Sequence, residues 1–358
     1  MTRRPIIIGA GPAGCAAAID LSRGGATPLL IDRDATAGDP ICGGFLSWQT
    51  ASRLRTLGFD PLDAGAPEVR RLALFAGRSM AEATLPAPGY GLSRQTMDGR
   101  LRELAIAQGV PFQVDRIRTV TPGRVEGETA TYDGDAIFLA TGKTDVRGIG
   151  RARDADDPAL GLRIHCRATD KLARLVSDGI ELHLFAGGYA GIVLQENGRA
   201  NICLALRKSL LLEAGGNPRS LLDRLAENSP RFADRLAEVP FDVAIDTIAA
   251  VPYGWRARDT EPGLFRLGDQ AAVIPSLAGE GMGIALASAR MASDFYRVGG
   301  VAAASSYQRR FFTRSRRPVA AAELLWKLGE TELGARLLRR ATSTVPALAH
   351  LAMRLSRI

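Results

Sequence analysis

Short apolar runs recur in separated parts of the chain, and helical patterns follow several of them. Each run has the length of a strand, and unbroken apolar runs of that length are typical of strands buried on both faces of a parallel sheet. The expected strands are residues 5–8, 28–31, 111–114, 135–139 and 264–267. Helical patterns cover residues 14–21, 92–109 and 284–295. This arrangement predicts an α/β domain around a parallel sheet.

A second group of segments has the signals of hairpins. Residues 71–75 and 80–85 flank the turn 76–79, and residues 180–185, 189–195 and 200–206 form a longer series. The last two of these are joined through Asn197-Gly198, a pair that favours tight hairpin turns. A further strand is expected at 241–249 and a helix at 219–236. Together they predict an antiparallel sheet inserted into the first domain, where it would form the wall that faces the substrate.

At 358 residues, the chain is longer than a usual single domain. We therefore expect two structural units and a tail. The predicted ranges are 1–65, 91–160 and 255–300 for a discontinuous nucleotide-binding domain, 66–90 and 161–254 for the inserted sheet domain, and 301–358 for a C-terminal helical region.

The C-terminal region is basic as well as helical. Of the net charge of +8, all is accounted for by residues 308–358, which hold eleven Lys or Arg and three Glu. Leucines recur there at helical spacing between the arginines. Two interpretations stay open: basic amphipathic helices that contact a membrane surface peripherally, or a helical hairpin that closes over the core with its arginines in solvent. Nucleic-acid binding is not expected, because no recognised nucleic-acid module accompanies the arginines.

Composition narrows the class further. An apolar content of 46% with 23% charged residues is that of an ordinary globular protein. No apolar run approaches the ~20 residues of a membrane span, and the start at Met1 leads into a strand without a signal peptide, so we expect a cytoplasmic protein. The four cysteines are scattered without C-x-x-C spacing, which argues against a metal site or a disulfide framework. Cys15 is expected to be a core residue.

The first glycine motif follows the first strand. Gly9 permits a tight turn, Gly11 lets the backbone approach a pyrophosphate, and Gly14 lets the next helix pack on the strand. Pro12 and Ala13 open that helix, whose N-terminus offers unpaired N–H groups to phosphates.

The second strand ends at an acidic residue. Asp32 lies 18 residues beyond Gly14, near the spacing at which a carboxylate reaches a ribose diol, and Arg33 is expected beside the adenosine. A dinucleotide is therefore the predicted ligand of this turn.

A second glycine motif more than 250 residues later decides which dinucleotide. Gly268-Asp269 ends a strand, and its carboxylate can accept hydrogen bonds from ribitol hydroxyls. Gly279-Glu280-Gly281-Met282-Gly283 then opens a helix whose positive end suits the pyrimidine edge of a flavin. Between the two motifs, Ala140-Thr141-Gly142 forms a turn where the backbone passes close to a dinucleotide. The two motifs together predict noncovalent FAD.

These residues resemble a known family. The order of Gly9 to Gly14, Asp32-Arg33, Leu92-Ser93-Arg94 with Asp98, Ala140 to Gly142 and Gly268-Asp269 is similar to the p-hydroxybenzoate hydroxylase type of flavoprotein. Cys42-Gly43-Gly44 and Gly279-Glu280-Gly281 resemble its geranylgeranyl reductase branch. The resemblance spans residues 5–300. It implies a Rossmann-like FAD-binding domain of the glutathione reductase type with an inserted sheet.

The resemblance also implies site residues, and it has departures. It adds Arg94, Thr141, Gly142, Pro275 and the segment Cys42-Gly43-Gly44 to the expected contacts of FAD. The hydroxylases' Asp-Gly motif is replaced by Thr141-Gly142-Lys143, and their Ala-Ala-His by Gln270-Ala271-Ala272. No aromatic-rich substrate signature of the prenyl reductases is evident.

Few residues of the chain can do chemistry without the flavin. The resemblance places Cys42 near the flavin, where its thiol can assist protonation or act as an inert small hydrophobe. Tyr189 and His165 are further candidate acids, each with a structural alternative. No Ser-His-Asp arrangement is evident among three histidines, so the flavin is expected to carry the hard chemistry.

The sequence therefore predicts an FAD-dependent oxidoreductase that acts on a hydrophobic small molecule. The favoured reaction is reduction of a carbon–carbon double bond, with NAD(P)H or another donor supplying electrons transiently. The alternatives are an aromatic monooxygenase or a dehydrogenase on the same fold and, in another class, a non-catalytic FAD-binding redox sensor.

Overall fold

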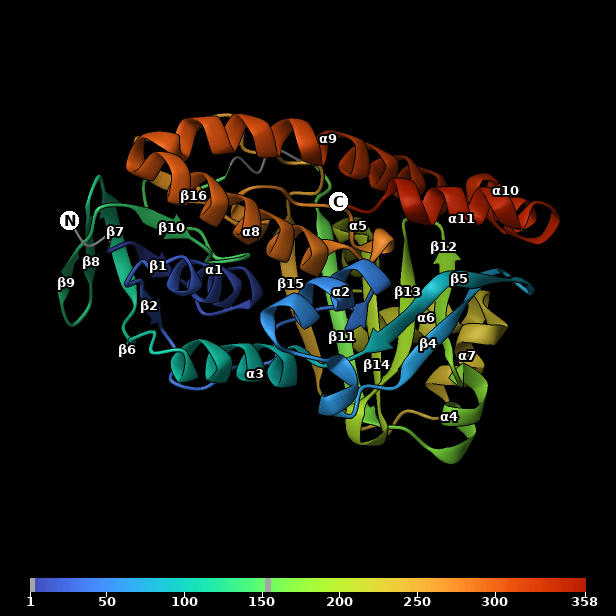
Figure 1. Ribbon diagram of the computed structural model, residues 1–358. Coiled ribbons are helices and arrows are strands. Elements are labelled where there is room, and N and C mark those ends of the chain that lie inside the picture. Colours follow the sequence, from blue (N-terminus) through green and yellow to red (C-terminus); the bar gives the residue numbers. More distant parts are fainter. Residues whose placement is uncertain (1–3, 152–155) are drawn as a thin grey trace.

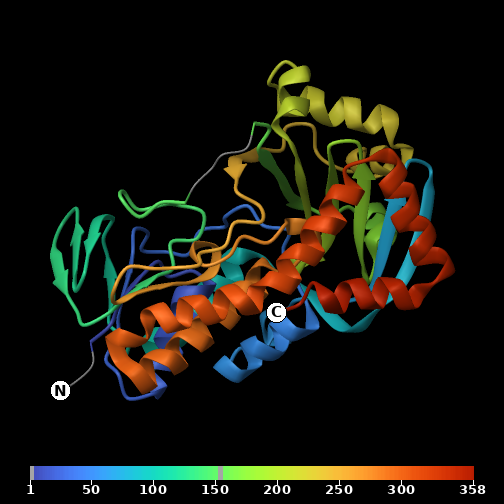
Figure 2. The same cartoon turned by 90° about the horizontal axis from the view of Figure 1, so that it is seen from above.

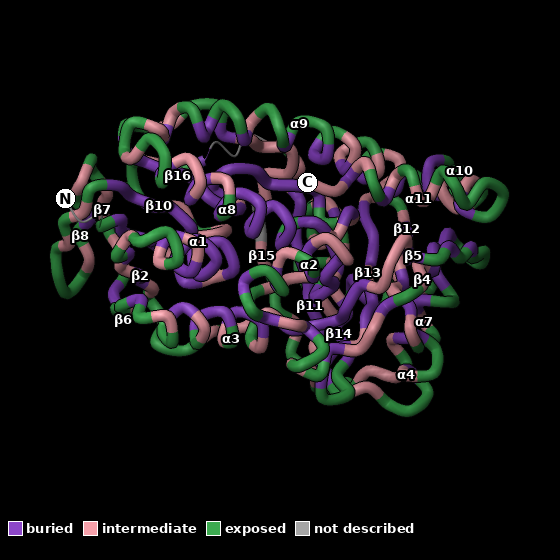
Figure 3. Tube along the Cα trace, in the orientation of Figure 1, coloured by how far each residue is buried: buried purple, intermediate pink, exposed green. Residues whose placement is uncertain are grey.

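Two large sheets, a small third sheet and a long C-terminal helical segment are the main parts of the computed structural model (Figure 1). It describes residues 4–151 and 156–358, so residues 1–3 and 152–155 of the expected ranges 1–65 and 91–160 lie outside it. Both large sheets and the helix that follows the first strand are largely buried (Figure 3).

The first sheet is parallel throughout, with the strand order β16-β10-β1-β2-β6. Its strands are β1 (Ile6–Ile8), β2 (Leu29–Asp32), β6 (Phe112–Val114), β10 (Ile137–Leu139) and β16 (Leu264–Arg266). Each corresponds to one of the expected apolar runs. The predicted Rossmann-like core is thereby confirmed.

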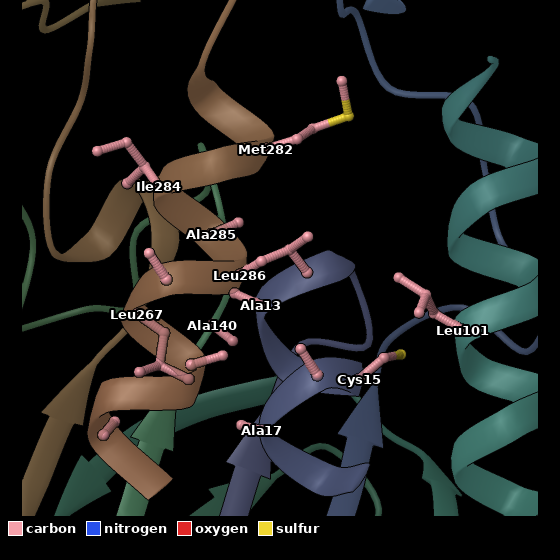
Figure 4. Close-up of a cluster of buried hydrophobic side chains, with 14 of the residues drawn as sticks. Ala13, Cys15, Ala17, Leu101, Ala140, Leu267, Met282, Ile284, Ala285 and Leu286 are labelled. Atoms are coloured by element: carbon pink, nitrogen blue, oxygen red, sulfur yellow. The ribbon is translucent and has the colours of Figure 1, made fainter. Parts of the chain in front are cut away.

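Small residues let two helices lie close together on this sheet. Ala13 and Ala17 of α1 (Pro12–Arg23) meet Ala285 and Leu286 of α8 (Gly281–Gly299) in one buried cluster (Figure 4). Further helices of this part are α2 (Trp48–Leu57) and α3 (Arg94–Ala107). Cys15 is fully buried and burial raises the pKa of its thiol, as expected of a core cysteine.

The opposite face of the parallel sheet is covered by a small sheet that the sequence patterns did not indicate. It consists of β7 (Ile117–Thr121), β8 (Arg124–Gly127) and β9 (Thr131–Asp133). Val125 packs with Ile6, Ile8 and Ile31. The loop between β8 and β9 is tied to Asp115, whose carboxylate accepts from the backbone N–H groups of residues 128 and 130 at 2.9 and 3.2 Å.

The larger sheet has the order β15-β11-β14-β13-β12-β4-β5-β3. Its strands are β3 (Phe45–Leu46), β4 (Glu68–Ala76), β5 (Ser79–Gly91), β11 (Ala159–Arg167), β12 (Gly179–Phe185), β13 (Gly188–Gln195), β14 (Arg199–Arg207) and β15 (Ile245–Val251). Neighbouring strands run antiparallel except β4 and β12, which are parallel. The β11–β15 pair joins Ala159 to Val251 in register.

The predicted hairpins are present, and two other expectations are corrected. Asn197 and Gly198 both have left-handed backbones, with φ of 58° and 67°, as a tight hairpin turn requires. The helix expected at 219–236 is broken into α6 (Pro218–Asn228) and α7 (Pro230–Leu236), because Pro230 has no N–H to continue the helix. The strand expected at 241–249 begins at Ile245 instead. Arg219 donates hydrogen bonds to the backbone carbonyls of residues 241 and 243, at 2.7 and 3.3 Å. These carbonyls are therefore bonded to α6 and not to a neighbouring strand.

Helices cover both faces of the larger sheet (Figure 2). Leu221, Leu222 and Phe232 of α6 and α7 pack on one face. On the other face, Trp326 and Ala335 pack against Leu74 and Leu184. Trp326 belongs to α9 (Ala304–Gly329) and Ala335 to α10 (Glu332–Thr344). The last helix, α11 (Pro346–Leu355), follows α10. No helix in the described part of the chain has the length and apolar character to span a bilayer.

Shorter helical segments complete the chain. They are α4 (Asp170–Val176), α5 (Lys208–Glu213) and the 3-10 turns η1 (Pro61–Ala64), η2 (Glu196–Gly198), η3 (Gly268–Gln270), η4 (Ser276–Ala278) and η5 (Gly300–Ala303).

The packing of α1 on the sheet gives the first prediction. A Cβ at Gly14 would lie 1.8 Å from the carbonyl oxygen of Gly9, so Gly14→Ala must push the helix away from β1. We expect a loss of about 1–3 kcal/mol in the free energy of unfolding, measured by urea denaturation. Gly99→Ala in α3 is the matched control, because its Cβ would meet Ala37 at an ordinary 3.8 Å. Equal stability of the two variants would contradict the close approach of α1.

Candidate functional site

Both glycine motifs border one cavity of about 1160 Å³. It extends from the ends of β1 and β2 to the face of the larger sheet that α9–α11 cover. The expected residues that line it are Gly9, Gly11, Pro12, Ala13, Asp32, Arg33, Cys42, Gly43, Gly44, Arg94, Thr141, Gly142, Tyr189, Gly268, Asp269, Gly279, Glu280, Gly281 and Met282. Gly14, Pro275 and Gly283 do not line it, and neither does His165.

The turn after β1 presents backbone to the cavity. Gly9 has a φ of 103°, and Gly11 is the N-cap of α1, without a side chain that caps the helix. The first N–H groups of α1 therefore remain available to an anion. Asp32 supports this turn, because its carboxylate accepts from the N–H of Ala10 at 2.5 Å.

A buried ion pair lies next to the turn. Two of the three guanidinium nitrogens of Arg94 in α3 donate to the carboxylate of Asp98, Nε at 2.9 Å and Nη2 at 2.6 Å. Burial raises the pKa of the Asp98 carboxyl against the opposing effect of Arg94. Arg94 Nη2 also lies 3.4 Å from where a Cβ of Gly11 would be. A guanidinium thus borders the predicted pyrophosphate position.

The loop that carries Cys42 is held from both domains. Asn201 of β14 donates to the carbonyl of Cys42 at 3.0 Å, and Lys143 donates to that of Ile41 at 2.8 Å. The side chain of Cys42 is half-buried and lines the cavity. Gly43 faces open space, whereas a Cβ at Gly44 would collide with Gln195 at 2.0 Å. The two glycines therefore have different roles, one in access and one in packing.

His165 belongs to the support of this loop. Its Nδ1 lies 3.3 Å from Asp39, which also binds Arg163 at 2.9 Å. Because His165 does not reach the cavity, the structure gives no geometry for the acid role that we considered.

The second motif surrounds the opposite part of the same cavity. Asp269 borders it, and the main-chain carbonyl of this residue accepts from Arg151 at 3.1 Å. Gly268 and Gly279 have φ of 55° and 62°, so the chain turns at both. Gly281 begins α8, which has no side-chain cap, and both Gly281 and Met282 line the cavity, so the first amide groups of this helix remain available there.

Glu280 is fixed by residues that the sequence patterns did not indicate. Its buried carboxylate accepts from Ser47 at 3.0 Å and from Arg357 at 2.9 Å. Arg357 also donates to the carbonyl of Ala278 at 2.6 Å. Burial raises the pKa of Glu280, and Arg357 opposes that shift. Gly283 serves this arrangement, since a Cβ there would lie 2.1 Å from Glu280 Oε1.

Beyond the second motif the cavity becomes apolar. One wall is the larger sheet and the other is α9–α11, and the side chains that they contribute are mostly aliphatic. They are Leu72, Leu74, Leu85, Ile180, Leu182, Leu184, Ile248, Val251, Leu325, Leu338, Ala341, Leu348, Ala349, Ala352 and Met353, and Leu277 of η4 adds to them. The C-terminal helices are therefore part of the cavity wall.

Hydroxyl groups gather where the two parts of the cavity meet. Tyr189 donates to Ser276 at 2.9 Å, and the hydroxyl of Tyr253 lies 2.6 Å from the same oxygen. Burial raises the pKa of both phenols. Tyr253 and Ser276 were missed by the sequence patterns, because neither follows a recognisable motif.

The cavity fits FAD on two independent grounds. A Cβ at Gly43, Gly142 or Gly281 would meet nothing within 4 Å, which leaves space along the backbone at three separated turns. Two helix N-termini, of α1 and α8, face the same cavity without side-chain caps.

Comparisons with known proteins agree with this geometry. The model of the pyridine nucleotide-disulphide oxidoreductase family matches residues 3–157. Digeranylgeranylglycerophospholipid reductase 2 of Methanopyrus kandleri is 27% identical over 81% of this chain and 75% of its own length. Menaquinone reductase of Mycolicibacterium smegmatis is 25% identical over 84% of this chain and 78% of its own.

The chain is similar to FAD-dependent oxidoreductases, both through the family model over residues 3–157 and through relatives of 25–27% identity. The predicted resemblance to the p-hydroxybenzoate hydroxylase type and its geranylgeranyl reductase branch is thus confirmed.

Solved structures share the fold of this flavoprotein. The flavin-dependent brominase Bmp2 has a TM-score of 0.80 at 16% identity, with 99% of this chain and 93% of that chain covered. PqsL of P. aeruginosa has a TM-score of 0.75 at 17% identity, with 94% and 100% covered. At such identities the likeness concerns the fold alone.

Asp269 gives the second prediction. If its carboxylate accepts from the ribitol of FAD, Asp269→Ala removes a hydrogen bond to a charged group, worth ~1.5–3 kcal/mol. We expect about a ten- to hundredfold weaker affinity of the apoprotein for FAD, measured by flavin fluorescence titration. Asp259→Ala is the control, because Asp259 is exposed and outside the cavity. Unchanged affinity in Asp269→Ala would place the ribitol elsewhere.

The Glu280–Arg357 pair gives the third prediction. Arg357→Gln leaves a carboxylate buried without its cation, which typically costs about 3–5 kcal/mol, and it releases the turn at Gly279-Glu280-Gly281. We expect lower stability and weaker FAD binding, while Arg354→Gln, at an exposed site near the end of α11, has neither effect. The double variant Glu280→Gln/Arg357→Gln should recover part of the stability. No recovery would show that the two side chains do not act as a pair.

Proposed function

We propose that this flavoprotein reduces a carbon–carbon double bond in an elongated apolar molecule of the isoprenoid class. The observation that carries the proposal is the continuity of the cavity: the part lined by the two glycine motifs leads into an arm walled by aliphatic side chains. An apolar chain can lie in this arm with one double bond near the flavin position, and no charged group of the substrate is required.

The relatives support the same reaction class. Three relatives are named as reductases. Their names give a digeranylgeranylglycerophospholipid as the substrate of two of them and menaquinone as the substrate of the third. The identities of 25% to 27% leave the substrate of this chain as a proposal.

The cofactor and the protein would divide the chemistry. Bound FAD, reduced by NAD(P)H or another donor, supplies the hydride, and the site must supply a proton to the neighbouring carbon. Tyr189 is the first candidate donor, because its side chain lines the cavity and its hydroxyl is linked through Ser276 to Tyr253. Cys42 is the second candidate donor. The aliphatic arm excludes water around the substrate.

An anaerobic experiment tests the reaction. The holoprotein is reduced, mixed without oxygen with a geranylgeranyl lipid, and followed by flavin absorbance and product mass. We expect reoxidation by the lipid and a product that has gained two hydrogen atoms. Reoxidation only after oxygen is admitted, with a product that has gained oxygen, would establish the monooxygenase alternative. If neither occurs with any apolar substrate, the redox-sensor alternative holds.

Variants of the two candidate donors give the fourth prediction. Removal of a general acid slows turnover by about 10²-fold or more, so Tyr189→Phe or Cys42→Ala should slow lipid-dependent reoxidation by that factor. Both variants should retain FAD and reduce at the normal rate. Cys42→Ser keeps nearly the size of the side chain but replaces the thiol with a weaker acid. Slow reoxidation in this variant would therefore report the acidity of Cys42 and not its size. Full speed in all three variants would show that neither side chain donates the proton.

A further inference from the structure

We propose that the α10–α11 hairpin binds the surface of an anionic lipid bilayer and admits the substrate to the cavity directly from it. The second part of this proposal rests on the proposed function, whereas binding to the bilayer does not.

Several large apolar side chains are exposed on the outer surface of the hairpin. Leu333 and Leu337 of α10 are 70% and 54% exposed, and they lie one helical turn apart. In α11, Leu348 and Leu351 are each 50% exposed and again one turn apart. Val345, in the turn that joins the helices, is 45% exposed. Large apolar side chains gathered on one exposed element mark a contact site rather than ordinary surface.

The inner surface of the same hairpin is the wall of the cavity. Leu338 and Ala341 of α10 and Ala352 and Met353 of α11 line the apolar arm. Leu348 both lines the cavity and is half exposed, so the cavity reaches the surface beside the turn at Val345. A substrate that enters there can pass from the exposed leucines to the aliphatic lining of the arm.

The charges around the leucines select the partner. Lys327, Arg336, Arg340 and Arg354 are exposed on α9–α11. Only two carboxylates, Glu330 and Glu332, lie between residues 327 and 354. Glu330 pairs with Arg207 at 2.8 Å, and Glu332 lies beside Arg336, so the basic side chains outnumber the acidic ones here. Leucines with arginines between them are typical of helices that lie in a bilayer interface, and a net positive charge favours anionic lipids. A second copy of the chain would place these arginines against each other.

Vesicle sedimentation tests the proposal with the intact holoprotein. We expect binding to phosphatidylcholine vesicles that contain phosphatidylglycerol, and about tenfold or more weaker binding to phosphatidylcholine alone. The variant Leu333→Gln/Leu337→Gln/Leu351→Gln should lose this binding while retaining FAD, because none of the three residues lines the cavity.

A matched control removes exposed apolar residues elsewhere. Leu212→Gln/Phe241→Gln/Val298→Gln changes three side chains that are 63%, 85% and 84% exposed and lie outside the hairpin. This variant should bind vesicles as the wild type does. No binding by the wild type, or equal losses in both variants, would overturn the proposal. The wild type could instead form dimers in light scattering and fail to bind vesicles. If the leucine variant abolished those dimers, the partner would be a second copy of the chain.

Entry of the substrate is tested separately from the reaction. The leucine variant should turn over a lipid substrate in detergent at the wild-type rate and lose about tenfold or more of the rate when the lipid is embedded in vesicles. Equal rates in vesicles would contradict entry from the bilayer. If the protein reduces no lipid in either form, the proposed function fails, and the vesicle-binding result still stands on its own.

Discussion

The close approach of α1 to the parallel sheet is the constraint on which the rest of the structure depends. Gly14 lies against the carbonyl of Gly9, and a Cβ at Gly9 itself would be 2.4 Å from the carbonyl oxygen of Ala140. Three segments of backbone therefore meet without side chains between them. This contact directs the N-terminus of α1 toward the cavity, and α8 packs on α1 through its small residues, which directs a second N-terminus to the same place.

The two halves of the cavity differ in how they are built. The half beside the glycine motifs presents backbone amides and a few fixed polar groups, such as Asp32 and Arg94, as a charged dinucleotide requires. The other half is formed mostly by aliphatic side chains of the larger sheet and of α9–α11, with the hydroxyls of Tyr189, Tyr253 and Ser276 where it meets the first half. A site of this kind can hold one cofactor tightly and accept substrates by shape, which is consistent with the variety of reactions found on this fold.

The sequence allowed the parallel sheet and the glycine turns to be predicted because their signals are local. A buried strand, a glycine that must turn and a small-residue helix each leave a pattern within a few residues. The groups that were missed act over long distances. Arg357 reaches Glu280 from 77 residues away, and Tyr253 meets Ser276 only because two loops converge. The break at Ser229 has a local cause instead, because Pro230 has no N–H with which to continue α6.

The register of the larger sheet has a consequence for the order of folding. β10 and β16 are neighbours in the parallel sheet, yet the chain between them includes most of the larger sheet. That intervening segment enters and leaves the larger sheet at paired residues, Ala159 and Val251. If it folds first, it shortens the loop that must close before β16 can join β10, and the entropic cost of completing the cofactor site falls accordingly. The larger sheet would then act as the scaffold on which the nucleotide-binding half is assembled.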